Sequence, residues 1–209
     1  EFPKEFAAVG VPIHERGART NEALEVIDKL LREEDVHFDG RFTKLDGITL
    51  LPHPIQKPRI PFWVAGRRDA AMKRAAHYVE GWLPYMYTPE MLGESLTKIA
   101  KWTAEAGRPP GSVQGGLFIF TCVHQDRETA LEIVNQQLSR QYNQDFSRLV
   151  GKYTISGSPA DCIARIQQYV DAGARTIVFS QGCPPDYVEE NMRQIAESLL
   201  PAFREAGGR

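Results

Sequence analysis

The chain has 209 residues, of which 42% are hydrophobic and 25% are charged, with a formal net charge of -2. This size and composition fit one domain of an ordinary globular protein, and the charge gives no reason to expect nucleic acid or an anionic membrane surface as a partner. No apolar run approaches the roughly 20 residues that a membrane-spanning helix needs. The three cysteines are widely spaced and odd in number, which favours a reduced, cytoplasmic setting over a disulfide-bonded one.

The N-terminal part of the chain predicts a loop followed by a helix. Residues 1–17 are punctuated by glycine and proline and are expected to be a loop. Apolar residues then recur at helical spacing from Asn21 to about Glu34, and Thr20 is the candidate N-cap.

The next segment changes character and predicts a small β insertion. Residues 36–43 alternate around an Asp-Gly pair, which is a strong short-range signal for a β-hairpin. Four prolines follow within ten residues, Pro52, Pro54, Pro58 and Pro61, and they indicate an extended connector rather than a helix. We therefore interpret residues 35–59, approximately, as an insertion between regular elements.

From residue 60 onward the chain alternates between strands and helices. Apolar strands in such an alternation are typical of a parallel sheet covered by helices, joined by right-handed crossovers. Four strand–helix units are half of what a closed eight-stranded barrel requires. The units are predicted at 60–79, 81–107, 113–142 and 176–206, and a further helix follows Ser158 and ends near Gly173.

The turn after the first of these strands has the features of an anion site. An apolar strand ends at Gly66 and a helical pattern starts at once, so backbone N–H groups and the positive end of a helix dipole point at one spot. Such a spot binds phosphate. Arg67 and Arg68 add guanidinium donors suited to phosphate oxygens. The alternative is a pair of solvated arginines, which the dipole would disfavour without an anion.

Other candidate residues have simpler explanations. Trp82 is either a core or pocket-wall aromatic residue or a ring that stacks on a ligand. His37, His53 and His77 are spaced in a way that makes no metal site. Cys183 follows the last strand, but no activating base can be identified for a catalytic thiol, so the sequence assigns no catalytic residue.

Several segments, taken in order, resemble the C-terminal part of the bacterial luciferase-like monooxygenase family. No one segment would suffice, but their order along nearly the whole chain makes the resemblance specific. The matching segments are Glu5–Gly10, Glu15–Glu22, Phe38-Asp39-Gly40-Arg41-Phe42, Leu51–Gln56, Pro61–Ala76, Gly81-Trp82-Leu83-Pro84, Gly157–Asp161 and Asp171–Ala174.

This resemblance implies a (β/α)8 TIM-barrel fold and a reduced FMN or deazaflavin (coenzyme F-420) cofactor. It implies that Gly66, Arg67 and Arg68 line the flavin phosphate site, with Gly81 and Trp82 beside it. Many members carry a small hydroxyl residue where this chain has Arg68, so guanidinium would replace hydroxyl donation. The implied activity is hydride transfer or oxygen insertion on a small organic substrate.

The resemblance also implies that residues 1–209 form a single luciferase-like α/β domain, with only about the C-terminal half of the barrel. The leading hypothesis is a flavin- or deazaflavin-dependent oxidoreductase or monooxygenase. The alternative is a non-catalytic flavin-binding or structural shortened barrel that associates with another chain, so we expect a homo-oligomer. A third, weaker hypothesis is an unrelated α/β enzyme that binds a sugar phosphate at the same turn.

Overall fold

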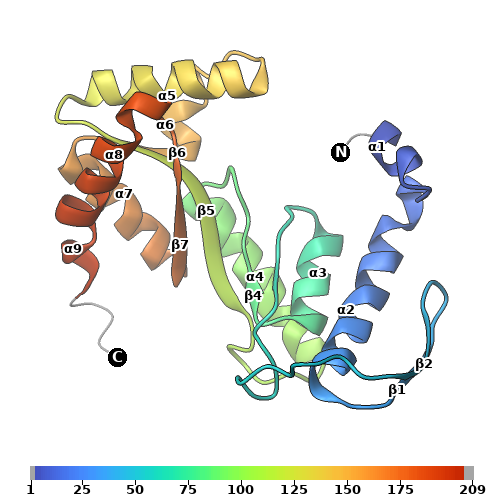
Figure 1. Ribbon diagram of the computed structural model, residues 1–209. Coiled ribbons are helices and arrows are strands. Elements are labelled where there is room, and N and C mark those ends of the chain that lie inside the picture. Colours follow the sequence, from blue (N-terminus) through green and yellow to red (C-terminus); the bar gives the residue numbers. More distant parts are fainter. Residues whose placement is uncertain (1–2, 205–209) are drawn as a thin grey trace.

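The computed structural model describes residues 3–204, and a parallel sheet is its central element (Figure 1). Each pairing in this sheet is parallel, with β3 beside β4, β4 beside β5, and β5 beside both β6 and β7. The four predicted strands are therefore neighbours, as expected, although the first two are shorter than predicted. The strands are β3 (Trp63–Val64), β4 (Gly81–Trp82), β5 (Gln114–Val123), β6 (Thr154–Gly157) and β7 (Thr176–Gln181).

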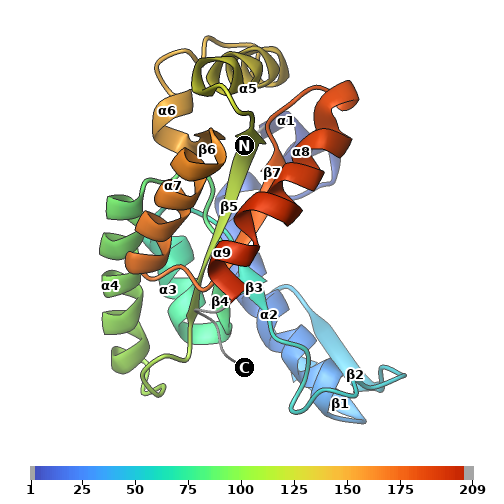
Figure 2. The same ribbon diagram turned by 90° about the vertical axis from the view of Figure 1, so that its left-hand side faces the viewer.

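Helices cover one face of this sheet, as the view in Figure 2 shows. They are α3 (Asp69–Tyr78), α4 (Pro89–Glu105), α7 (Pro159–Asp171) and α8 (Val188–Gln194). The main core lies between the strands and these helices, and each large apolar side chain buried in it contributes about 1.5–3 kcal/mol. It includes Trp82, Leu92, Ile99, Leu117, Ile155, Ile166 and Leu199.

Strand β5 changes neighbours along its length because β4 ends early. The N–H of Phe118 donates to the carbonyl of Pro84 at 2.9 Å, and the N–H of His124 donates to that of Gly157 at 3.0 Å. Residues an even number of positions apart in a strand direct their backbone groups to the same edge. The unpredicted strand β6 therefore takes over the edge of β5 that β4 has left, while β7 pairs with the opposite edge.

A buried asparagine completes the edge of β5 beyond the end of β7. The Asn191 side chain accepts from the N–H of Val123 at 2.8 Å and donates to the carbonyl of Thr121 at 2.9 Å. It also donates to Oε1 of Gln181 at 2.7 Å. Buried backbone groups need such partners, so Asn191 replaces a strand neighbour and fastens α8 to the sheet.

The N-terminal segment is more helical than predicted. Helix α1 (Pro3–Ala8) and a 3-10 helix, η1 (Ile13–Glu15), occupy much of the expected loop, and α2 (Arg16–Arg32) begins before Asn21. The prediction of a loop is therefore wrong for residues 3–8 and 13–17, while residues 1–2 lie outside the described part, and Thr20 is not the N-cap. Its hydroxyl instead donates to the carbonyl of Arg16 at 2.7 Å, inside the helix.

The predicted hairpin is present and is docked on α2. Strands β1 (Val36–Asp39) and β2 (Lys44–Ile48) pair antiparallel, so the second strand begins later than predicted. The carboxylate of Glu22 accepts the backbone N–H groups of Arg41 and Phe42 at 2.8 and 2.9 Å. These bonds satisfy the turn amides and hold the hairpin against the helix.

The remaining helices agree with the sequence patterns at their starts. Asp126 caps α5 (Arg127–Tyr142) by accepting from the N–H of Thr129 at 2.7 Å, and Ser158 and Asp161 form a capping box at α7. The last predicted helix is divided into shorter pieces. These pieces are η2 (Pro185–Tyr187), α8, the π-helical η3 (Ile195–Leu199) and α9 (Pro201–Arg204). A further short helix, α6 (Val150–Tyr153), lies just before β6.

Within residues 3–204, the other side of the sheet is largely free of helices between its amino ends and the level of Tyr85. The strand register places five side chains on this open face: Trp63, Leu83, Tyr85, Phe118 and Val178. Trp63, Tyr85 and Val178 are 36%, 41% and 39% exposed. Large apolar side chains at this level of exposure indicate a surface that contacts a ligand or another chain.

Two glycines make room for the indole on the open face. A Cβ on Gly81 would overlap the ring of Trp63, and a Cβ on Gly116 would lie 2.7 Å from the same ring. Both glycines are therefore required by the close approach of Trp63.

Farther toward the carboxyl ends, α5 covers the same side of β5. Phe120 packs there in a second, smaller cluster with Val134 and Leu138 of α5 and with Phe146. None of the helices within residues 3–204 is long and apolar enough to cross a membrane.

Candidate functional site

The Gly66 turn connects the carboxyl end of β3 to α3. Gly66 has φ +119, a left-handed value that favours glycine, and a Cβ there would lie 2.7 Å from the Cβ of Ala71. Arg68 has extended dihedrals and is the N-cap of α3. The structure thus forms the strand–turn–helix arrangement that the sequence predicts at this position.

The carbonyl groups of this turn face the core. The indole N–H of Trp82 donates to the carbonyl of Gly66 at 2.9 Å, and the hydroxyl of Tyr87 donates to that of Arg67 at 3.4 Å. Trp82 and Tyr87 meet edge to face at 5.5 Å, and Tyr169 donates to the carbonyl of Tyr87 at 2.7 Å. Buried side chains therefore fix the orientation of the turn from the side that faces the core.

The donors of the turn are directed outward. The carbonyl of Arg68 accepts the N–H groups of Ala71 and Met72, but those of Asp69 and Ala70 have no acceptor among residues 3–204. Within the same residues the Arg68 guanidinium is unpaired and exposed. Free amides, a helix N-terminus and an unpaired cation form a site suited to an anion.

Two neighbouring charges modify this site. The Arg67 guanidinium lies over the ring of Tyr85, 5.4 Å from its centroid, so it is oriented by a cation–π contact. The carboxylate of Asp69 lies in the first turn of α3 but is paired with Lys98 at 3.5 Å. The turn therefore keeps a net positive charge, because Arg67 and Arg68 are both present and the charge of Asp69 is neutralised by Lys98.

The five sequence-predicted residues do not all lie on one surface. Gly66, Arg67 and Arg68 form the turn, and Trp82 contacts it through the carbonyl of Gly66 while being completely buried. Gly81 is also buried and faces the ring of Trp63. The structure thus brings Trp82 to the turn as a supporting residue, while Gly81 shapes the open face.

Sequence reasoning missed the segment after β4 that lies next to the turn. Tyr85 contacts Arg67, and Tyr87 bonds its carbonyl. Between them Met86 has φ +52, which is uncommon for a residue other than glycine and clusters at functional sites. The available signal was a pair of tyrosines between a strand and the Thr88-Pro89 start of the next helix.

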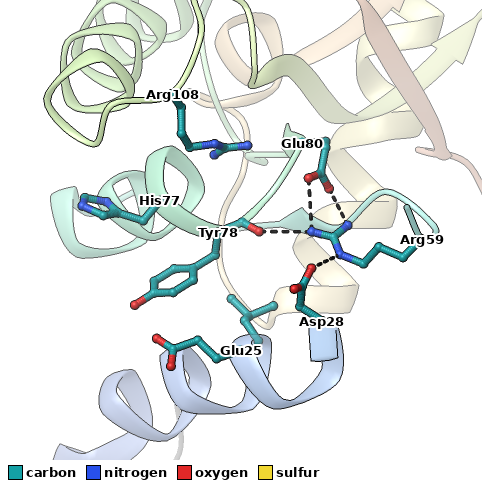
Figure 3. Close-up of a pocket in the computed structure, with 8 residues that line it drawn as sticks. Glu25, Asp28, Arg59, His77, Tyr78, Glu80 and Arg108 are labelled. Atoms are coloured by element: carbon teal, nitrogen blue, oxygen red, sulfur yellow. Dashed lines mark hydrogen bonds and ion pairs between the residues drawn. The ribbon is translucent and has the colours of Figure 1, made fainter. Parts of the chain in front are cut away.

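A second polar region, a pocket of about 250 Å³, lies near the amino ends of β3 and β4 (Figure 3). Its central residue is Arg59, whose side chain is 7% exposed. The guanidinium donates to Asp28 at 2.6 Å and to both carboxylate oxygens of Glu80 at 2.8 and 3.1 Å. It also lies 3.6 Å from the centroid of the Phe62 ring.

The charges of this pocket stabilise each other. Burial alone would raise the pKa of Glu80, but hydrogen bonds from Arg59 and from the N–H of Phe62 lower it below its usual value. Arg108 bonds the carbonyls of Ala75, Ala76 and Val79 at the end of α3. Barrel-type active sites lie at the carboxyl ends of the strands, so we interpret this pocket as structural.

The cysteines give no support to thiol chemistry. Cys122, Cys162 and Cys183 are free and buried. Burial raises the pKa of Cys183, and raises those of Cys122 and Cys162 to about 12. Such thiols are weak nucleophiles at neutral pH.

Comparison with known proteins identifies the family. The model of the luciferase-like monooxygenases matches residues 1–176, so the chain belongs to that family. Its parallel sheet with helices on one face is part of a (β/α)8 TIM-barrel type fold, as predicted.

Individual relatives show the same fold over part of their length. A coenzyme F420-dependent glucose-6-phosphate dehydrogenase of Microbacterium testaceum is 26% identical over 91% of this chain, which spans 62% of that protein. The monooxygenase RslO1 of Streptomyces bottropensis is 25% identical, with a TM-score of 0.83 over 97% of this chain and 66% of its own. The coenzyme F420-dependent tetrahydromethanopterin reductase of Methanopyrus kandleri has a TM-score of 0.72 at 19% identity, over 90% and 64%.

Proposed function

We propose that this chain is part of a flavin- or deazaflavin-dependent oxidoreductase or monooxygenase that acts on a small organic substrate. Coenzyme F420 is a candidate cofactor because two of the relatives named above depend on it, and FMN is the other candidate that the family resemblance implies. The observation that carries the proposal is the outward-facing Gly66 turn, with the unpaired Arg68 guanidinium at the N-terminus of α3.

The residues present fit the phosphate group that both cofactors carry. The N–H groups of Asp69 and Ala70 and the guanidinium of Arg68 would donate to phosphate oxygens, while Trp82 and Tyr87 hold the turn in place. When bound, the cofactor would supply the redox chemistry, and the protein would position it. Arg67 would add positive charge while remaining oriented by Tyr85.

The test is the double variant Arg67→Ala/Arg68→Ala. Each charge-assisted hydrogen bond is worth roughly 1.5–3 kcal/mol, so FMN or F420 affinity is expected to fall by about tenfold or more. Fluorescence titration of the cofactor measures it. The matched control, Arg32→Ala/Arg193→Ala, removes the same charge from two exposed positions on other helices and should leave affinity nearly unchanged.

Unchanged affinity in the double variant would rule out the phosphate site. Absence of any flavin or deazaflavin binding by the unaltered chain would favour a non-catalytic shortened barrel. Tight binding of a sugar phosphate alone would favour an unrelated phosphate-binding enzyme.

The open face favours one part of the alternative reading, association with another copy. Trp63 and Val178 expose apolar area that a packed barrel would cover. At roughly 25 cal/mol per Å², covering about 400 Å² of it would contribute on the order of 10 kcal/mol. We expect sedimentation of the 209-residue chain to show concentration-dependent self-association, reduced by Val178→Lys. A monomer that persists at high concentration and turns over substrate would contradict this.

A further inference from the structure

A row of aromatic side chains leads from the Gly66 turn to the end of α5. Tyr85 pairs with Phe118 across the sheet, so both lie on the open face. The rings of Phe118 and Phe120 meet edge to face at 5.9 Å, and those of Phe120 and Tyr142 at 6.3 Å. The row therefore begins beside Arg67 and ends at Tyr142, where α5 passes over the carboxyl ends of the strands.

The two tyrosines at the ends of this row are accessible. Tyr85 is 41% exposed and Tyr142 is 40% exposed, whereas Phe120 between them is buried. Partial burial, followed by the proximity of Tyr85, raises the pKa of Tyr142. Its hydroxyl therefore stays protonated at neutral pH and can donate a hydrogen bond.

From this arrangement we propose that Tyr85 and Tyr142 form the substrate wall of the site. The ligand it fits is a small molecule with an aromatic or other apolar body and an acceptor oxygen. The rings would contact the body of the ligand, and the phenol hydroxyls would donate to its oxygen. This inference rests on the proposed function, since the contact of Arg67 with Tyr85 places the wall next to the cofactor anchor.

The contacts of each tyrosine favour this role over a purely structural one. Tyr142 packs against Phe146 with ring centroids 5.3 Å apart, so its ring is held by its apolar side. Among residues 3–204, neither phenol hydroxyl has a hydrogen-bond partner, unlike those of Tyr87, Tyr169 and Tyr187. Two unpaired donors, joined by the row through Phe118 and Phe120, are available to a ligand.

The experiment compares two probes on the 209-residue chain. Acetophenone carries an aromatic ring and an acceptor oxygen, while ethylbenzene has a similar shape without the oxygen. Ligand-observed NMR titration gives both dissociation constants. A neutral hydrogen bond changes affinity by about 2- to 10-fold. The unaltered chain should therefore bind acetophenone at least about 2-fold more tightly than ethylbenzene.

The preference should shrink in Tyr85→Phe and in Tyr142→Phe, and disappear in the double variant, with ethylbenzene affinity nearly unchanged. Tyr78→Phe, at the distant amino-end pocket, is the matched control. These substitutions keep the ring, so the fold is retained. A preference that survives in the double variant, or no acetophenone binding at all, would overturn the substrate wall.

A third arm separates the wall from the cofactor site. Acetophenone should still bind when FMN is saturating, whereas competition would assign the tyrosines to the cofactor ring and overturn the proposal. In Arg67→Ala/Arg68→Ala the loss of FMN binding with intact acetophenone preference would support both inferences. If neither FMN nor coenzyme F420 binds the unaltered chain, the proposed function fails, and the acetophenone preference alone decides on the wall.

Discussion

Replacing Asn191 with leucine is expected to lower the free energy of unfolding by about 2–4 kcal/mol. Leucine has a similar volume but no polar atoms, so the buried N–H of Val123 would lose its acceptor, while the carbonyl of Thr121 would keep the N–H of Gly182. Each unsatisfied buried group costs about 1–3 kcal/mol, and the Oε1 of Gln181 would lose its donor as well. Urea denaturation followed by circular dichroism measures the change.

The control for this variant lies on the same helix. Arg193→Ala removes exposed ion pairs with Glu190 and Glu197, which are screened by solvent and contribute little to stability. If Asn191→Leu unfolds at the same urea concentration as Arg193→Ala, the side chain does not complete the edge of β5 in the way described.

Replacing Glu80 with alanine is expected to destabilise the chain by about 3 kcal/mol. The change leaves the buried Arg59 guanidinium with Asp28 as its remaining carboxylate partner and removes the acceptor of the Phe62 N–H. Breaking a buried ion pair from one side costs about 3–5 kcal/mol. We expect the lower end because Glu80 itself is partly exposed. Thermal unfolding measures the loss.

The same pair predicts a pH dependence. The pKa of Glu80 is lowered in the folded protein, so its contribution is present above the ordinary carboxylate pKa and is lost as the pH falls through the lower, folded value. The unaltered chain should therefore lose stability below about pH 4.5 more steeply than Glu80→Gln, which cannot ionise. Parallel pH curves for the two would show that Glu80 does not interact with Arg59 as an ion pair.

The sequence predicted the parallel sheet because long apolar runs alternate with amphipathic helices. It did not reveal β6, since Thr154–Gly157 is four residues long and has no alternation of its own. That strand forms only because β4 leaves an edge of β5 open for it. The helical start of α2 was hidden in a similar way, because Gly10 and Pro12 made the surrounding residues resemble a loop.

The candidate site was predictable in its main chain and less so in its side chains. Gly66, Arg67 and Arg68 could be found because a strand, a glycine and a helix start are all visible in the sequence. The burial of Trp82 and the approach of Tyr85 to Arg67 depend on tertiary packing. No local pattern gives the pairing of Tyr85 with Phe118, which brings together residues more than thirty positions apart.

The fit of Trp63 over Gly81 and Gly116 has a consequence for how this chain can vary. The indole occupies the space that two side chains would otherwise fill, so the three positions share one volume. A methyl group added at either glycine would require a smaller ring or aliphatic residue at position 63. Among homologues these three positions are therefore expected to change together, and a library that varies them jointly should recover folded combinations that single substitutions miss.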